Sequence, residues 1–275
     1  MHKYPGKNAD RDKLLRIGPG LEYVANAHSS APEKFLKLSP LRAIELTMSQ
    51  PTTSIVRSQE HVAATAALHV EVIADLVCPF CFLGKRRLDA AMRAVQGPSD
   101  VSWHPYQLNP DMPADGMSFD DYLARRFGDP ANIQPVLDSL VAEGARDGIE
   151  FRFDKLTHVP NTLPAHQLMQ LAETEGKDQS VLAEDLMTAF FESGANIGDT
   201  DVLISLAARH GLSADAVRQS VSDNQVRQIV LSREAQVRSS GMSGVPGFLL
   251  NRRLLVVGAQ DKDTLINAFD RAMFG

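Results

Sequence analysis

The sequence predicts an α/β protein in which strands and helices follow the order β-α-β … α-β-β-α, with a helical domain inserted in the middle. Residues 69–109 have the pattern of a strand, a helix and a second strand, residues 112–224 show helical patterns alone, and residues 225–275 return to mixed structure. A β-α-β unit of this size indicates a right-handed crossover between parallel strands. We therefore predict a discontinuous α/β domain, residues 67–111 and 225–275, interrupted by an all-helical insertion domain.

The first β-α-β unit begins with HVEVIADL, a short segment rich in β-branched residues that indicates a buried strand. Pro79 suits the first turn of the following helix, because the missing N–H of proline has no helical partner to lose there. Apolar residues then recur near the 3.6-residue period until Gly97-Pro98 ends the helix. Residues 101–109, VSWHPYQLN, are predicted to form the second strand.

The inserted segment shows six helical patterns with marked ends. Ser118 with Asp121, and Asp199, are typical of helix starts, whereas glycine is typical of helix stops. The predicted helices are Phe119–Phe127, Val136–Ala145, Leu163–Ala172, Val181–Phe191, Val202–Ala208 and Ala214–Val221, with stops at Gly128, Gly148, Gly176, Gly194 and Gly211.

The last section supplies the rest of the α/β domain. It is predicted to contain a helix at Gln225–Val237, strands in GVPGFLLN and RRLLVVGAQ, and a closing helix at Lys262–Met273. Asn251-Arg252-Arg253 is short enough to be a hairpin turn, so these two strands should be antiparallel.

Residues 1–66 differ from the rest of the chain. They are rich in Pro, Ser, Lys and Thr and show little periodicity beyond a short helix at Leu38–Met48, so we predict a poorly ordered extension. Charges occupy the first sixteen residues and no apolar segment follows, which argues against a secretory signal. Transit peptides avoid the acidic residues found here, so we expect a cytoplasmic protein, with mitochondrial import as the less favoured alternative.

The composition excludes several classes of partner. A formal net charge of -6 argues against a broad phosphate-binding face, so we expect no nucleic-acid partner. No apolar run approaches the roughly 18 residues that a bilayer requires, so we expect no membrane partner. The chain has only 2 cysteines, which excludes a disulfide scaffold. In a reducing compartment such a pair is more often catalytic or metal-binding than structural.

The two cysteines, Cys78 and Cys81, lie at the predicted junction of strand and helix. Residues three apart on a helix have Cβ atoms roughly 5 to 6 Å apart, close to the range that a disulfide needs. The free backbone N–H groups and the positive end of the helix dipole favour a thiolate at Cys78, on the exposed tip of the helix. Cys78 is therefore the expected nucleophile and Cys81 the resolving thiol.

The neighbours of the cysteines allow several interpretations. We expect Lys85 to be a solvated surface charge rather than a group that stabilises the thiolate. Asp75 has two equally weighted interpretations, a proton relay for Cys81 or a partly exposed carboxylate at the strand end. A zinc site would need two more ligands, and the spacing of His158 and His166 fits no standard pattern, so we expect no metal. Two buried structural thiols are a further, less favoured alternative.

Residues 239–251, SSGMSGVPGFLLN, hold a second candidate feature. Pro246 stands directly before an apolar strand, where its missing N–H is ordinarily a liability. A cis peptide bond between Val245 and Pro246 would give a tight turn that faces the thiols, with backbone groups of Val245 available to an extended substrate. Taken by itself, Gly-Val-Pro more often forms a plain turn.

From about Val70 to its end the chain resembles the DsbA-like thioredoxin-fold family, most closely its FrnE-like branch of thiol oxidoreductases. The resemblance rests on five ordered segments, DLVCPFCFLGKRRLDAA, YQLNPDMP, PNTLPAHQLMQLA, FFESGANIGDTDVLISLA and GVPGFLLNRRLLVVGAQ. It implies a thioredoxin-like fold with an inserted helical domain, a redox pair at Cys78 and Cys81, and a cis-proline at Pro246. The chain departs from the family at Phe80, where Trp is usual, and at Gly247, where an aromatic is usual.

The resemblance implies a thiol:disulfide oxidoreductase that acts on protein or small-molecule disulfides or dithiols through the CPFC motif. It implies no tightly bound cofactor, with glutathione or another thiol as the external redox partner. Phe80, Asn109, Val245 and Pro246 are the candidate substrate-binding residues. The sequence leaves a homodimer open.

A sister branch gives the alternative function, a glutathione-dependent isomerase or transferase of the hydroxychromene-carboxylate isomerase or kappa-class type. Its members share Asn109, which helps to hold glutathione, but typically have Ser in place of Cys78. The transferases also use a Ser-Asp pair where this chain has Ala259-Gln260. A third hypothesis is a catalytically silent binding module that retains the groove.

Overall fold

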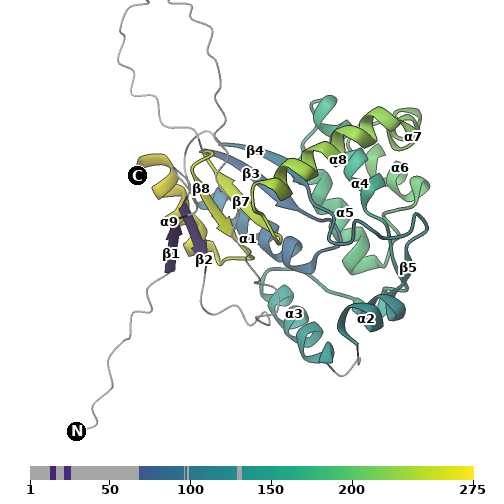
Figure 1. The fold of residues 1–275 in the computed structure, drawn as a ribbon, viewed down its shortest axis with the longest axis horizontal. Coiled ribbons are helices and arrows are strands. Elements are labelled where there is room, and N and C mark those ends of the chain that lie inside the picture. Colours follow the sequence, from purple (N-terminus) through teal and green to yellow (C-terminus); the bar gives the residue numbers. More distant parts are fainter. Residues whose placement is uncertain (1–12, 17–21, 26–67, 96, 98, 129–131) are drawn as a thin grey trace, which may run out of the picture.

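The computed structural model describes residues 13–16, 22–25, 68–95, 97, 99–128 and 132–275. Its centre is a six-stranded mixed sheet with the strand order β1-β2-β8-β7-β3-β4 (Figure 1). The strands are β1 Lys13–Arg16, β2 Glu22–Ala25, β3 Leu68–Ala74, β4 Ser99–Pro105, β7 Gly247–Leu250 and β8 Leu254–Val257.

The strand pairing agrees with the sequence analysis. Strands β3 and β4 are parallel, and helix α1, Pro79–Ala94, connects them. Strands β7 and β8 are antiparallel. Their turn places Asn251 and Arg252 in the left-handed region, with φ values of 47° and 53°. The backbone N–H of Arg253 closes this turn on the carbonyl oxygen of Leu250 at 3.0 Å.

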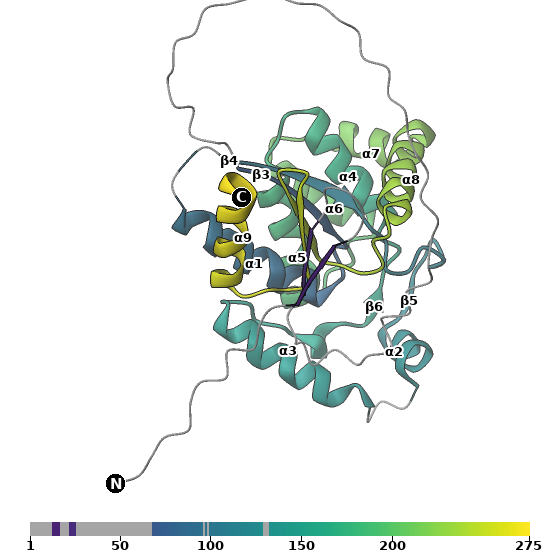
Figure 2. The same ribbon diagram turned by 60° about the vertical axis from the view of Figure 1, so that its left-hand side comes forward.

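The buried side chains on one face of β3 form part of the core against which α1 lies. Val70 and Val72 alternate along this strand and are 0% and 1% exposed, as the two-residue period of a strand requires. Helix α9, Lys262–Phe274, packs beside α1 and contacts β3, β7 and β8 (Figure 2). The β3-to-α1 junction is therefore held by both the sheet and a neighbouring helix.

The insertion contains the six helices that the sequence predicts. The cap residues also behave as expected, because Ser118 accepts a hydrogen bond from the N–H of Asp121 and Asp199 accepts from the N–H of Asp201. In Figures 1 and 2 helices α4 to α8 form one group, and α2 and α3 lie apart from it. These six helices are α2 Phe119–Phe127, α3 Gln134–Arg146, α4 Leu163–Thr174, α5 Gln179–Ser193, α6 Thr200–Ala208 and α7 Ala214–Ser222, with a 3-10 helix at Phe153–Lys155. Helix α8, Asn224–Ser239, corresponds to the helix predicted at Gln225–Val237.

The insertion differs from the prediction in two respects. It is not purely helical, because β5, Met117–Ser118, pairs with β6, His158–Val159. Strands of two residues are too short to show a period in the sequence. The insertion also shares one continuous core with the α/β segments, and the rings of Phe82 on α1 and Phe191 on α5 stack at 5.9 Å.

Residues 1–66 differ from the expected disorder at two places. The backbone of β1 pairs with β2 in antiparallel fashion, and β2 pairs in parallel with β8. The free edge of β8 offers unpaired N–H and C=O groups, which these four-residue strands satisfy. The other residues of this segment, including the predicted helix at Leu38–Met48, lie outside the described residues. Within the described part of the chain, no helix has the length and apolar character needed to span a membrane.

Candidate active site

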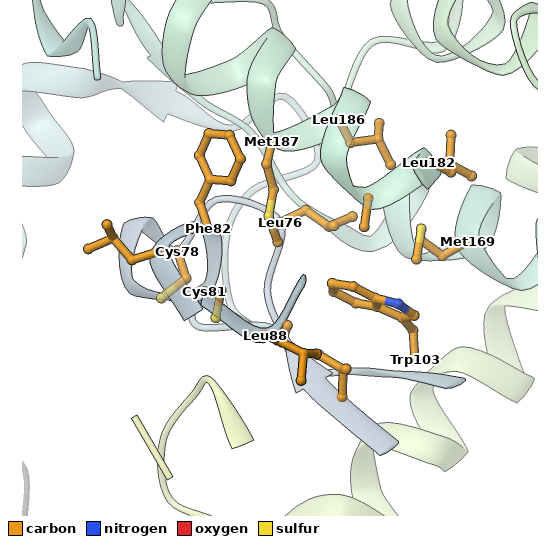
Figure 3. Close-up of a cluster of buried hydrophobic side chains, with 14 of the residues drawn as sticks. Leu76, Cys78, Cys81, Phe82, Leu88, Trp103, Met169, Leu182, Leu186 and Met187 are labelled. Carbon is orange, nitrogen blue, oxygen red and sulfur yellow. The ribbon is translucent and has the colours of Figure 1, made fainter. Parts of the chain in front are cut away.

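The two cysteines lie where the sequence predicts, at the start of α1. Cys78 is the N-cap residue, with extended φ and ψ of -93° and 115°, and Pro79 begins the helix. The carbonyl oxygen of Cys78 accepts from the N–H of Cys81 at 3.0 Å, which closes the first turn. Figure 3 shows both side chains on the same turn of α1. Both thiols are free.

The burial of Cys78 corrects the sequence analysis, which places this residue on an exposed helix tip. Cys78 is 3% exposed and Cys81 is 1% exposed. Burial raises the pKa of Tyr122 of helix α2, while a hydrogen bond with Asn109 opposes the increase. Tyr122 lies close enough to this site for the charges of Cys78 and Asp75 to raise its pKa further.

The Cys81 thiol is held in its protonated form. Burial raises its pKa well above the ordinary value, and the hydrogen bond and charge of Cys78 raise it further. A backbone hydrogen bond from Asp75 lowers this pKa, whereas the charge of the Asp75 carboxylate raises it. A resolving thiol in this position needs a base that removes its proton.

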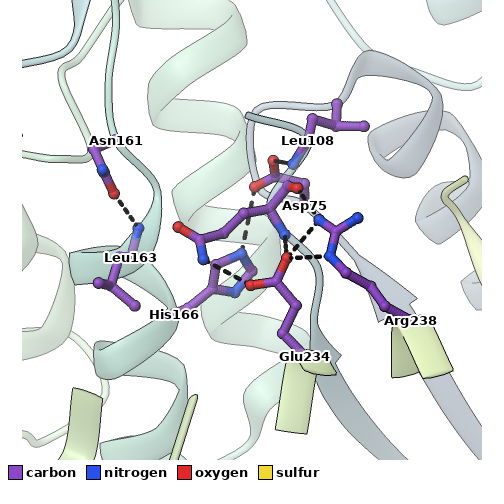
Figure 4. A network of polar contacts seen from close by, with 8 residues as sticks. Asp75, Leu108, Asn161, Leu163, His166, Glu234 and Arg238 are labelled. Carbon is purple, nitrogen blue, oxygen red and sulfur yellow. Dashed lines mark hydrogen bonds and ion pairs between the residues drawn. The ribbon is translucent and has the colours of Figure 1, made fainter. Parts of the chain in front are cut away.

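Asp75 is the acidic group beneath the thiols. It is 0% exposed, so the alternative of a partly exposed strand-end carboxylate is wrong. One carboxylate oxygen, Oδ2, accepts a hydrogen bond from the N–H of Leu108 at 2.7 Å. The other, Oδ1, lies 3.4 Å from Nε2 of His166 on α4 (Figure 4).

A second buried carboxylate fixes the loop after β4. Glu234 on α8 is 4% exposed and accepts hydrogen bonds from the backbone N–H and the side-chain amide of Gln107, at 2.9 and 2.7 Å. Arg238 donates to the same carboxylate at 2.6 Å, and its guanidinium lies 4.0 Å from the centre of the Tyr106 ring. This network holds the segment that carries Leu108 and Asn109 against the thiol site.

The loop before β7 reaches the same helix. The peptide bond between Val245 and Pro246 is cis, as the sequence analysis expects. Pro246 packs on α1 at Gly84, where a Cβ atom would lie 2.9 Å from Cγ of the proline. At Gly247, where the family usually has an aromatic, the space for a Cβ atom is filled by the Met242 side chain.

The structure brings together most of the predicted site residues. Cys78, Cys81 and Asp75 interact directly, and Asn109 reaches them through Tyr122. Phe80 is 38% exposed beside the thiols, and Val245 is partly buried.

Lys85 corrects a second expectation. It is 3% exposed rather than solvated, and its ammonium group pairs with Asp89 at 2.7 Å and with Glu184 of α5 at 2.8 Å. Lys85 therefore joins α1 to the insertion.

The sequence analysis missed three residues of this region, Tyr122, His166 and Glu234. His166 was considered only as a metal ligand, although a histidine within the apolar pattern of α4 signals a buried polar group. Nothing in the sequence distinguishes Glu234 from other acids on an exposed helix face. Across the described residues, no group of three or more His, Cys, Asp or Glu side chains could hold a metal ion.

The fold and the paired thiols define a thioredoxin-fold protein with a dithiol at a helix N-terminus. Residues 69–270 match the family model of the DSBA-like thioredoxin domain, and the chain belongs to this family. The chain is thus a member of the DsbA-like family of thiol oxidoreductases, and proteins of this family act on disulfide substrates.

Three known proteins show the extent of the similarity. The uncharacterized protein YwbO of Bacillus subtilis strain 168 is 26% identical over 204 residues, which are 73% of this chain and 95% of that protein. The crystal structure of the probable DsbA oxidoreductase SCO1869 from Streptomyces coelicolor superposes with a TM-score of 0.69 at 27% identity, covering 74% of this chain and 89% of the other. A putative protein disulfide isomerase from Nitrosomonas europaea shares the fold at 16% identity, with a TM-score of 0.58 and coverage of 75% and 95%.

Proposed function

We propose that this protein is a thiol:disulfide oxidoreductase of the FrnE-like type that acts on protein or small-molecule disulfides through Cys78 and Cys81. The observation that carries the proposal is the pair of free thiols on the first turn of α1, beside a buried carboxylate. The family membership supports this class of reaction.

The reaction has two covalent steps. The Cys78 thiolate, favoured by the N-terminus of α1, attacks one sulfur of a substrate disulfide and forms a mixed disulfide, and the other substrate sulfur leaves as a thiolate. Cys81 then gives up its proton and attacks Cys78. A Cys78–Cys81 bond forms, the bond between Cys78 and the substrate breaks, and the second substrate sulfur leaves with the electron pair. The substrate is reduced by two electrons and the protein dithiol is oxidised.

The surrounding residues have distinct roles in this proposal. Asp75 accepts the proton of Cys81, because its carboxylate is buried beside that thiol. The exposed ring of Phe80 offers an apolar contact to the substrate, and the backbone of Val245 before Pro246 offers hydrogen-bonding groups. Asn109 orients Tyr122 near Cys78. An external thiol, glutathione or another, returns the protein to its dithiol form in the reducing cytoplasm.

Trapping the mixed disulfide tests this proposal. A Cys81→Ser variant incubated with glutathione disulfide should accumulate one glutathione on Cys78, detected by mass spectrometry, because the resolving thiol is gone. Wild-type protein should instead form the internal disulfide, and a Cys78→Ser control should form neither species. Absence of any adduct in Cys81→Ser would refute the proposed chemistry.

A glutathione-dependent isomerase or transferase is the second candidate. The burial of Cys78 favours it, because a small thiol cofactor reaches a 3%-exposed residue more readily than a protein disulfide does. In that case Cys78 only positions the glutathione thiol, and the Cys81→Ser variant should keep full activity towards a hydroxychromene carboxylate or a chloroaromatic substrate.

A further inference from the structure

Two buried polar atoms face each other below the thiol pair. Oδ1 of Asp75 and Nε2 of His166 are 3.4 Å apart, and the two side chains are 0% and 4% exposed. Neither atom has a hydrogen-bond partner within the described part of the chain. A buried polar atom without a partner costs about 1 to 3 kcal/mol, so two of them aimed at each other require an explanation.

His166 also lines a small cavity. It has a volume of about 20 Å³ and is lined by side chains of β4, α4 and α8, including His104, Gln170 and Arg233. A site of this size holds one water molecule, and within a mostly apolar lining the side chains of His104, His166 and Gln170 offer that molecule hydrogen-bond partners. Gln170 and Arg233 are half-buried, so the cavity approaches the surface between α4 and α8.

We propose that His166 is a positioning residue of the redox site, which receives the Cys81 proton from Asp75 and passes it to water in the α4–α8 cavity. This inference rests on the proposed function and deepens it. The proton leaves through the insertion, away from the substrate at Cys78.

The chemistry of the resolving step makes such a route useful. When Cys81 attacks Cys78, the Cys81 proton moves to Asp75, and the departing substrate thiolate takes a proton from solvent. Because the Asp75 carboxylate is fully buried and cannot pass a proton to solvent itself, the proton moves on to His166 within the same resolving step. His166 is the titratable neighbour of Asp75 Oδ1 and also reaches the cavity.

The other charged groups near this route are already paired. On the Asp75 side these groups are the two cysteines of α1 and Tyr122 of α2. On the His166 side, His104 of β4 pairs with Glu71 at 2.8 Å, and Arg233 of α8 pairs with Glu173. The Asp75–His166 pair is therefore free to exchange a proton without breaking another ion pair.

Single-turnover reduction of dithiobis(nitrobenzoate) tests the route, because it separates the two covalent steps. The first nitrothiobenzoate is released when Cys78 attacks, and the second when Cys81 resolves the adduct. In His166→Gln the second phase should slow about 100-fold at pH 7, the scale of general acid-base catalysis, while the first phase stays unchanged. The second-phase rate of this variant should rise with pH more steeply than that of the wild type, because hydroxide must replace the relay.

The matched control is His210→Gln. His210 also pairs with a carboxylate in the insertion, Asp185 at 3.0 Å, but neither residue lies among those of the thiol site. Both phases of the control should match the wild type. Imidazole added to His166→Ala should restore the second phase, because the cavity and the deleted ring leave room for it.

Several results would overturn the proposal. Equal slowing of both phases in His166→Gln would indicate a merely structural residue, and an unchanged second phase would exclude the relay while leaving the thiol chemistry intact. Absence of a second phase in wild-type protein would instead refute the proposed function. If the variants do not fold, the rate of the wild-type second phase is measured instead in mixtures of light and heavy water. A curved dependence of rate on deuterium content is expected, and a linear dependence would overturn the relay.

Discussion

The raised pKa of Cys81 predicts how the stability of the reduced protein depends on pH. At pH values below 9.0, the ordinary value of the thiol, Cys81 is protonated in both the folded and the unfolded chain. Above this pH the unfolded chain releases the proton while the folded chain retains it, so the unfolded state gains relative stability. The free energy of unfolding should therefore fall as the pH rises from 9.0 towards the folded-state pKa.

The expected slope follows from the linkage between proton binding and folding. One proton retained only by the folded state costs about 1.4 kcal/mol of stability for each pH unit. Urea titrations at about pH 7, 8.5, 9 and 10 with a reductant present measure this free energy. Subtracting the same series for Cys81→Ser removes the contribution of the lysines and tyrosines, because both proteins share them.

The measured quantity is the difference in the free energy of unfolding between the wild type and Cys81→Ser. It should be constant between pH 7 and 8.5 and should fall by about 1 to 1.4 kcal/mol between pH 9 and 10. A difference that stays flat up to pH 10 would show that the Cys81 thiol titrates at its ordinary value and is not shielded from water.

Two further predictions concern the stability of the folded protein. Gly84→Ala should destabilise the protein by about 1 kcal/mol. Overpacking of the new methyl group against Pro246 and Phe248 costs about 1 to 3 kcal/mol, and the higher helix propensity of Ala offsets about 1 kcal/mol of this cost. A gain in the urea midpoint would show that the proline loop yields without cost. Glu234→Ala should lower the free energy of unfolding by about 2 to 3 kcal/mol, because the buried backbone N–H and side-chain amide of Gln107 lose their hydrogen-bond acceptor. A loss below about 0.5 kcal/mol would show that another group holds this loop.

Local signals made the helices and the cysteine position predictable. Phe119–Phe127 is predicted and observed with the same bounds, because Ser118 at its start and Gly128 at its end carry the information within one turn. The same holds for Cys78 and Pro79, where a strand, a cap and a first-turn proline follow one another directly. The cis bond at Pro246 was expected from the family resemblance, because the residues before the apolar strand alone are more typical of a plain turn.

Burial of the polar side chains was not predictable, because it depends on residues far away in the chain. Periodicity places Lys85 on the thiol side of α1, but its partner Glu184 comes about a hundred residues later. The pairing of Asp75 with His166 likewise joins a strand end to a helix of the insertion. The expectation of an exposed Cys78 took α1 alone into account, whereas Cys78 belongs to the buried core that the α/β segments share with the insertion.

The ring cluster between α1 and the insertion bears on how such proteins diversify. Phe82 lies between Phe151, at 6.0 Å and perpendicular, and Phe191, stacked at 5.9 Å. Excising the insertion would leave this aromatic side chain of the active-site helix facing water. The helical part is therefore no detachable module, and natural or engineered shuffling of substrate specificity has to proceed by point changes within it rather than by swapping it whole.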